Sequence, residues 1–219
     1  MTPDRRVALI AGISYLITFA SSIPAVLLIA PVLNDPRYIV GPGADARVIT
    51  GCLLDLVNAI ACVGTAVTLF PVIRRHNETM ALGFVASRLY EMAVIMIGVI
   101  CLLAVVALRQ PTGDQSVVEI GQALVAVRNK TFLLGPGLAP GFNALLLGSI
   151  FLRARLVPRW MPMVGLIGAP LIIVSVLMRA YGSNEFITAF AAIATAPIFV
   201  WELSIGLWMA IKGFQPRSA

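Results

Sequence analysis

Residues that bind metals or form disulfides are scarce in this sequence. The 219 residues include one histidine, His76, and three cysteines, Cys52, Cys62 and Cys101. The cysteines stand singly in apolar stretches, in no Cys-x-x-Cys or Cys/His pattern, and a free cysteine in such a place behaves as a small buried hydrophobic residue. The sequence therefore predicts no disulfide, no metal site and no cofactor, because a haem or di-metal bundle would lack its ligands.

Charged residues are also few. They make up 12% of the chain, where soluble domains carry roughly 25%, while hydrophobic residues make up 59% and the mean hydropathy is +0.95. The net charge of +6 does not indicate nucleic-acid binding, because the basic residues stand singly or in pairs at the ends of apolar segments. This composition excludes a soluble domain, and it places residues 1–219 in a single transmembrane domain whose partner is the lipid bilayer.

Six long apolar segments predict an all-α polytopic membrane protein, a bundle of six transmembrane helices. The first segment follows Arg5 and Arg6, and its length favours a spanning helix over the alternative of a cleaved signal peptide. Apolar residues recur at helical spacing over 116–128, where we expect either a short helix on the membrane surface or an irregular loop. The six expected spans are about 7–30, 48–73, 80–108, 132–152, 161–181 and 186–211.

The distribution of basic residues predicts the orientation of the bundle. Six spans put both termini on one side of the membrane, and nine Lys or Arg residues fall on that side against five on the other. Because basic loops are retained in the cytoplasm, we expect the N- and C-termini there. The nine are Arg5, Arg6, Arg74, Arg75, Arg153, Arg155, Arg159, Lys212 and Arg217, and the five are Arg37, Arg47, Arg109, Arg128 and Lys130.

Five charged residues fall inside the expected spans. A charge at the centre of a spanning helix costs about 2.5–3.5 kcal/mol, so such residues face the bundle interior and pair with one another. From a helical rise of about 1.5 Å per residue, Arg88 and Glu202 lie at a similar depth, about 12–14 Å from the cytoplasmic end, and Glu91 lies one turn deeper. We predict an Arg88–Glu91–Glu202 cluster, whose excess negative charge requires a proton, a cation or a ligand.

Asp55 begins a polar stripe that continues through Asn58 to Thr65 at helical spacing on the second expected helix. We predict that Asp55 pairs with Arg179 nearer the outer surface, and that Asn143 supplies a polar group from the fourth span. The alternative is that the buried charges and amides only fix helix packing. The full set of candidate ligand-binding residues is Arg88, Glu91, Glu202, Asp55, Arg179, Asn58 and Asn143.

Known catalytic motifs are absent from the sequence, which contains no HExxH, GxSxG or P-loop pattern. The expected function is therefore the binding or transport of a small solute, a lipid or a proton at the buried cluster. One alternative is an accessory or scaffolding membrane protein whose charges only fix helix packing. A third is an intramembrane enzyme that uses the buried carboxylates, and the lack of a motif weighs against it.

Three groups of residues carry a resemblance to a known family. They are Arg88-Leu89-Tyr90-Glu91, the segment from Ser149 to Trp160, and Trp201-Glu202-Leu203 followed by Lys212-Gly213-Phe214. In these residues, and over nearly its whole length, the chain resembles the bacterial membrane family called domain of unknown function 4386. The resemblance implies a six-helix bundle in the bacterial cytoplasmic membrane, and it implies no activity, because the family has none assigned.

Overall fold

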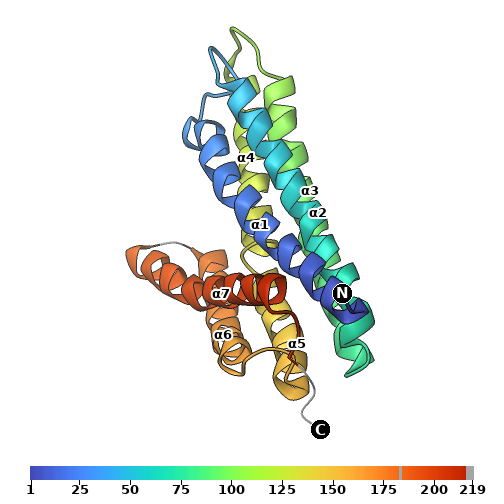
Figure 1. Cartoon of the computed structure of the whole chain (residues 1–219). Coiled ribbons are helices and arrows are strands. Elements are labelled where there is room, and N and C mark those ends of the chain that lie inside the picture. Colours follow the sequence, from blue (N-terminus) through green and yellow to red (C-terminus); the bar gives the residue numbers. More distant parts are fainter. Residues whose placement is uncertain (183, 216–219) are drawn as a thin grey trace.

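The computed structural model describes residues 1–182 and 184–215, so Arg217, which we expect in the cytoplasm, lies outside the described residues. The described part of the chain folds into seven helices (Figure 1), with one isolated β-bridge between Val40 and Gln110. The predicted all-α fold is confirmed. The helices are α1 (Pro3–Asn34), α2 (Asp45–Ile73), α3 (Glu78–Ala107), α4 (Gln115–Leu134), α5 (Ala139–Ala154), α6 (Trp160–Tyr181) and α7 (Glu185–Ile211).

Six stretches within these described ranges are long and apolar enough to cross a membrane, as predicted. Five are α1, α2, α3, α6 and α7, and the sixth is Gln115–Ala154, which contains both α4 and α5. A helix satisfies its own backbone hydrogen bonds, as the lipid interior demands. The protein is therefore a multi-pass membrane protein.

The fourth span differs from the prediction in where its helix is interrupted. We expected either a short surface helix or an irregular loop over 116–128 and a separate span over 132–152, but α4 continues through this junction and packs along α3. The interruption falls instead at the Gly-Pro-Gly sequence of residues 135–137, because glycine and proline are the residues that disfavour a helix most. Arg128 and Lys130, which we expected in an outer loop, consequently belong to α4.

Contacts between the helices divide the bundle into two layers. In the layer that holds both termini, α1, α2, α3, α5, α6 and α7 form a closed ring, in which each helix packs against the next and α7 returns to α1. In the other layer α4 packs on α3 near α1 and α2, while the far end of the α6–α7 hairpin lies to one side (Figure 1). Six helices therefore surround the interior near the termini, and four surround it near the opposite end.

Each layer has its own apolar core, and polar residues lie at the junction of the two. The core near the termini includes Tyr15, Leu69 and Phe84, and the other core includes Ile29 and Val99. On each of the first three helices, buried polar side chains lie near the point where the helix leaves one apolar core and enters the other. These are Thr18 and Ser21 on α1, Asn58 and Thr65 on α2, and Arg88 and Glu91 on α3.

The start of α1 and the end of α7 are held together by Arg5. Its guanidinium donates hydrogen bonds of 2.8–3.0 Å to the carbonyl oxygens of Met209, Ala210 and Ile211. These carbonyls end a helix and lack helical partners, and a cation also complements the negative end of the helix dipole. Near this point Gly12 of α1 lies so close to α7 that a Cβ atom would be 2.4 Å from the backbone nitrogen of Ala210. The start of α1 and the end of α7 therefore lie at the same end of the molecule (Figure 1).

The opposite end of the bundle is closed by Arg109, just after α3. Its guanidinium forms an ion pair with Asp45 and donates a hydrogen bond to the carbonyl oxygen of Gly41. The hydroxyl of Tyr38 donates to the same Asp45 carboxylate at 3.0 Å. Burial, and then the hydrogen bond to the Asp45 carboxylate, raise the pKa of Tyr38 to about 12. These contacts tie the α1–α2 loop to the α3–α4 loop.

Candidate functional site

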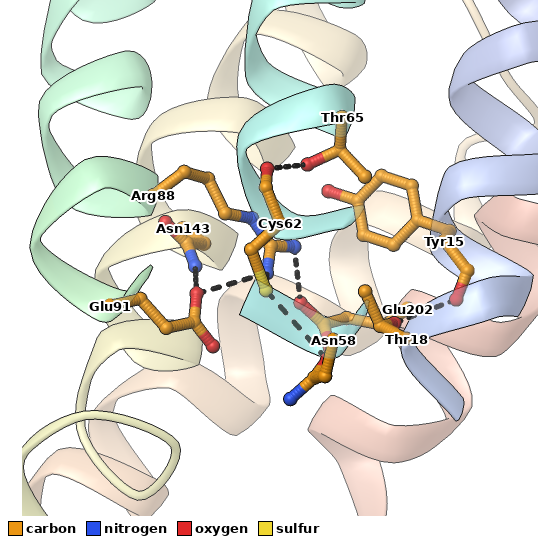
Figure 2. A network of polar contacts seen from close by, with 9 residues as sticks. All are labelled: Tyr15, Thr18, Asn58, Cys62, Thr65, Arg88, Glu91, Asn143 and Glu202. Carbon is orange, nitrogen blue, oxygen red and sulfur yellow. Dashed lines mark hydrogen bonds and ion pairs between the residues drawn. The ribbon is translucent and has the colours of Figure 1, made fainter. Parts of the chain in front are cut away.

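A charged cluster lies within the polar layer and is built around Arg88 of α3. Arg88 and Glu91 are three residues apart, so their side chains leave the same face of the helix. Figure 2 shows Arg88 between Glu91 and Glu202, which comes from α7, with Asn143 of α5 next to Glu91. Three helices of the six-helix ring thus supply the polar groups of the cluster.

The Arg88 guanidinium bonds to both carboxylates. Its Nη1 lies 3.0 Å from Oε2 of Glu91, and its Nη2 lies 2.7 Å from Oε1 of Glu202. Nδ2 of Asn143 donates a hydrogen bond to the same Oε2 of Glu91 at 2.9 Å. These distances are those of charge-assisted hydrogen bonds. The side chains of Arg88, Glu91 and Glu202 are 2%, 6% and 13% exposed, so the charges are sealed inside the bundle.

Aromatic and sulfur-containing side chains enclose the guanidinium of Arg88. Its central carbon lies 5.0 Å from the ring centre of Tyr15 and 5.7 Å from that of Phe84, within the range of cation–π attraction. Nη1 also approaches Sγ of Cys62 at 3.8 Å (Figure 2). Trp201, next to Glu202 in the chain, packs on α6 so tightly that a Cβ at Gly165 would lie 2.7 Å from the indole.

The cluster nevertheless has unused hydrogen-bonding capacity. Among the described residues of the cluster, Nε of Arg88 and Oδ1 of Asn143 are buried without a hydrogen-bond partner. Most buried polar atoms are paired, and an unpaired one costs about 1–3 kcal/mol. Two such atoms in one cluster show that its polar groups are incompletely satisfied in this state.

The structure brings together the residues that the depth comparison selected, because Arg88 contacts both Glu91 and Glu202. Asn143 joins them through Glu91. Asn58 lies one step further away, since its Oδ1 is 3.9 Å from Sγ of Cys62, which in turn contacts Arg88. The polar stripe predicted on α2 therefore leads from this cluster toward the other layer.

The predicted pair between Asp55 and Arg179 is wrong. Arg179 is exposed on α6, and α6 packs on α5 and α7 rather than on α2. Asp55 instead lines a pocket together with Arg128 of α4. The sequence reasoning missed Arg128 because its segment was expected at the membrane surface. Arg128 follows the buried Gly121 by seven residues, which places both on one face of a helix, and that spacing is the signal that could have found it.

The chemistry that the cluster offers is proton uptake and hydrogen bonding. Two carboxyl groups surround one guanidinium in an environment of low polarity, where an unneutralised carboxylate is costly. Within residues 1–182 and 184–215, no three His, Cys, Asp or Glu side chains are placed to hold a metal ion. The three cysteines are buried as free thiols.

Comparison with known proteins agrees with the resemblance carried by the motifs around Arg88 and Glu202. The family model described as Domain of unknown function (DUF4386) matches residues 10–213. This range contains every residue of the charged cluster, and it covers most of the chain. No curated protein and no solved structure matches the chain.

Proposed function

The chain belongs to this family of unknown function, and from the geometry of its buried cluster we propose that it is a transport protein of the bacterial cytoplasmic membrane that takes up and releases one proton. The observation that carries the proposal is the charge imbalance of the cluster, in which the single guanidinium of Arg88 bonds to the carboxyl groups of both Glu91 and Glu202. If both carboxyls were ionised, the cluster would hold one uncompensated negative charge. A charge at membrane depth costs about 2.5–3.5 kcal/mol, and one added proton removes it.

Glu91 is the carboxyl that we assign to carry the proton. The Asn143 amide donates to Oε2 of Glu91, while its own Oδ1 is buried without a partner in the described part of the chain. A half-turn of the amide would exchange its nitrogen and oxygen, so that Oδ1 accepts a hydrogen bond from a protonated Glu91. The same asparagine therefore suits both the ionised and the protonated form of Glu91, which is what reversible proton uptake requires.

The burial of the cluster favours a proton over a larger ligand. Arg88, Glu91 and Asn143 are at most 5% exposed as whole residues, so a solute or a lipid headgroup has no access to them in this conformation. A proton needs only a hydrogen-bonded path. The same closure weighs against an intramembrane enzyme, which would need a cavity that reaches the two carboxyls.

The basic residues support the cytoplasmic location of the termini. Because Arg128 and Lys130 belong to α4, the end of the bundle opposite the termini retains only Arg37, Arg47 and Arg109 among the five basic residues assigned to it. The excess of positive charge at the end that holds the termini is therefore larger than the sequence count suggested, and such an excess favours the cytoplasmic side.

Infrared difference spectroscopy of the purified protein in lipid tests the proposal, because a protonated carboxyl has a carbonyl band that the carboxylate lacks. We expect one such band to titrate with pH, to disappear in Glu91→Gln and to persist in the control Asp4→Asn, whose exposed carboxyl pairs with Arg75. Vesicles containing the unmodified protein should also acidify faster than vesicles containing Glu91→Gln under an imposed proton gradient. A band that survives in Glu91→Gln, or equal fluxes in folded proteins, would contradict the proposal.

The alternative function is that of an accessory membrane protein whose charges only join helices. It is supported by the position of the Arg88–Glu202 pair, which links α3 to α7 although these two helices do not pack along each other. A triple variant in which Arg88, Glu91 and Glu202 are all methionine separates the two readings. Apolar replacement of a whole buried charge group often preserves folding. The accessory function then predicts an intact bundle with no change in proton flux, whereas proton uptake predicts an intact bundle with the flux lost.

A further inference from the structure

A pocket in the other layer of the bundle contains a buried guanidinium that, among the described residues, has no ion-pair or hydrogen-bond partner. The pocket has a volume of about 40 Å³ and lies where α1, α2, α3 and α4 meet. Arg128 lines it and is 6% exposed as a whole residue. Its guanidinium lies 4.7 Å from the ring centre of Phe132. In the described part of the chain, that guanidinium forms no ion pair and donates no hydrogen bond, although it carries five N–H donors.

Further donors converge on the same space. Ser22 of α1 and Asn58 of α2 line the pocket together with Arg128, and each carries a hydroxyl or an amide that can donate a hydrogen bond. The only carboxyl group among the residues that line the pocket is Asp55, and it lies beyond ion-pair distance from Arg128. The pocket thus has more donors than acceptors, and its buried positive charge is left without a direct counter-charge.

We propose that this pocket binds one small monovalent anion, of the size of chloride, against the guanidinium of Arg128. Size and charge both select this class of ligand. A volume of 40 Å³ admits about one to three water molecules, so it accommodates a monatomic anion and excludes a phosphate ester or a lipid headgroup. A fixed guanidinium attracts anions and opposes the entry of cations.

Binding of the anion is coupled to a proton on Asp55. With Asp55 ionised and the pocket filled by water, the charges of Asp55 and Arg128 sum to zero. With an anion present, the sum is again zero only if Asp55 has taken a proton from solvent. The other titratable group near Asp55 is Cys52 on the same helix, and the residues of α1 and α3 that line the pocket are uncharged. Anion binding should therefore strengthen as the pH falls.

The site is distinct from the proton cluster, although the two are neighbours. Asn58 lines the pocket, and its Oδ1 also lies 3.9 Å from Sγ of Cys62, which contacts Arg88. This arrangement places an anion site and a proton site along one face of α2. Anion binding at Arg128 does not require proton exchange at Glu91, so each proposal can fail without the other.

Chloride is the probe that tests the inference. The line width of the ³⁵Cl resonance is measured with purified protein in detergent, with gluconate as the balancing anion. We expect the unmodified protein to broaden the line, and Arg128→Gln to weaken chloride binding by about tenfold or more, as expected for the loss of hydrogen bonds from a charged group. The substitution leaves Asp55 without the cation that lines the same pocket, so the Tm of the variant is measured first and chloride binding is compared in folded protein. Arg179→Gln, which alters an exposed arginine of α6, is the matched control and should leave binding unchanged.

Two further variants complete the test. Asp55→Asn should bind chloride with an affinity that no longer changes between pH 5 and pH 8, and Glu91→Gln should bind it as the unmodified protein does. The inference is overturned if the unmodified protein does not broaden the line, if Arg128→Gln broadens it equally, or if Asp55→Asn keeps the pH dependence. Loss of binding in Glu91→Gln would equally overturn it, because the ion would then belong to the Arg88 cluster.

Discussion

Replacing Arg88 with methionine should destabilise the protein by an amount that depends on pH. Methionine keeps much of the side-chain volume, so the loss is mainly electrostatic rather than the cost of a cavity. The carboxyls of Glu91 and Glu202 would stay buried, at 6% and 13% exposure, without the guanidinium that now bonds to both. A buried carboxyl that loses its cationic partner is neutralised by taking up a proton.

The size of the effect follows from the cost of that proton. A glutamate of ordinary acidity, with a pKa of about 4.3, requires about 3.7 kcal/mol to be protonated at pH 7. If one carboxyl of the cluster already carries a proton, the loss of Arg88 adds one more, and the expected loss of stability is about 4 kcal/mol. This agrees with the roughly 3–5 kcal/mol lost when one partner of a buried ion pair is removed. For a chain of this length it corresponds to a fall in Tm of roughly 8–16 °C.

The pH dependence distinguishes one proton from two. The folded variant holds a proton that the unfolded chain releases above a pH of about 4.3, so stability is lost as the pH rises. Between pH 7 and pH 5 the difference from the unmodified protein should shrink by about 1.4 kcal/mol per pH unit for one added proton. It should shrink about twice as steeply if both Glu91 and Glu202 are ionised in the unmodified protein.

The buried cysteines provide the assay. Cys52 and Cys101 are free and buried, so a thiol-reactive fluorophore reports thermal unfolding in detergent. Arg179→Met changes an exposed arginine of α6 and should shift stability by no more than about 0.5 kcal/mol. A Tm for Arg88→Met equal to that of the unmodified protein, or a loss that stays constant from pH 5 to pH 7.5, would refute the reasoning about the buried charges.

Two further predictions concern the ends of the bundle. Gly12→Leu should force α1 away from α7, because a Cβ atom there would lie 2.4 Å from the backbone nitrogen of Ala210. The Tm of this variant should fall well below that of the control Gly148→Ala, whose Cβ would make an ordinary contact at 3.4 Å. Equal Tm values for the two variants would argue against the close crossing of α1 and α7. Tyr38, with its pKa raised to about 12, stabilises the fold below pH 10 and loses this contribution as the pH rises through 12. The difference in phenolate absorbance between the unmodified protein and Tyr38→Phe should therefore titrate near pH 12, and a difference that titrates near pH 10 would contradict the contact with Asp45.

Comparing the depths of charged residues along their helices succeeded for the charged cluster, because α3 and α7 each have one terminus at the same end of the bundle. α3 begins and α7 ends at the end of the bundle that holds both termini, so counting residues from that end measures the depth of Arg88 and Glu202 directly. Glu91 follows from helix periodicity alone. The sequence contained everything needed to place these three charges at one level, apart from which helices are neighbours.

The comparison of depths failed for Asp55, because depth along a helix does not reveal which other helices pack against α2. Asp55 and Arg179 both lie toward the end opposite the termini, but the closed ring separates α2 from α6. The chain between α3 and α5 forms α4, which brings Arg128 to the same pocket as Asp55. Length and polarity made that segment resemble a surface connection, since its apolar face is narrow and becomes buried only by packing against α3 and the α1–α2 loop.

By itself the sequence determined the class of the protein, the number of its spans, the family and the level of the Arg88 cluster. These follow from local quantities, namely the length of apolar runs, the helical rise and the high cost of charge in lipid. Only the tertiary structure decided that two apolar cores meet at a polar layer, that Asn143 completes the cluster, and that Arg128 rather than Arg179 faces Asp55. Those features depend on which helices touch and in what register, and close contacts such as that of Gly12 with α7 set this register through packing between segments far apart in the chain.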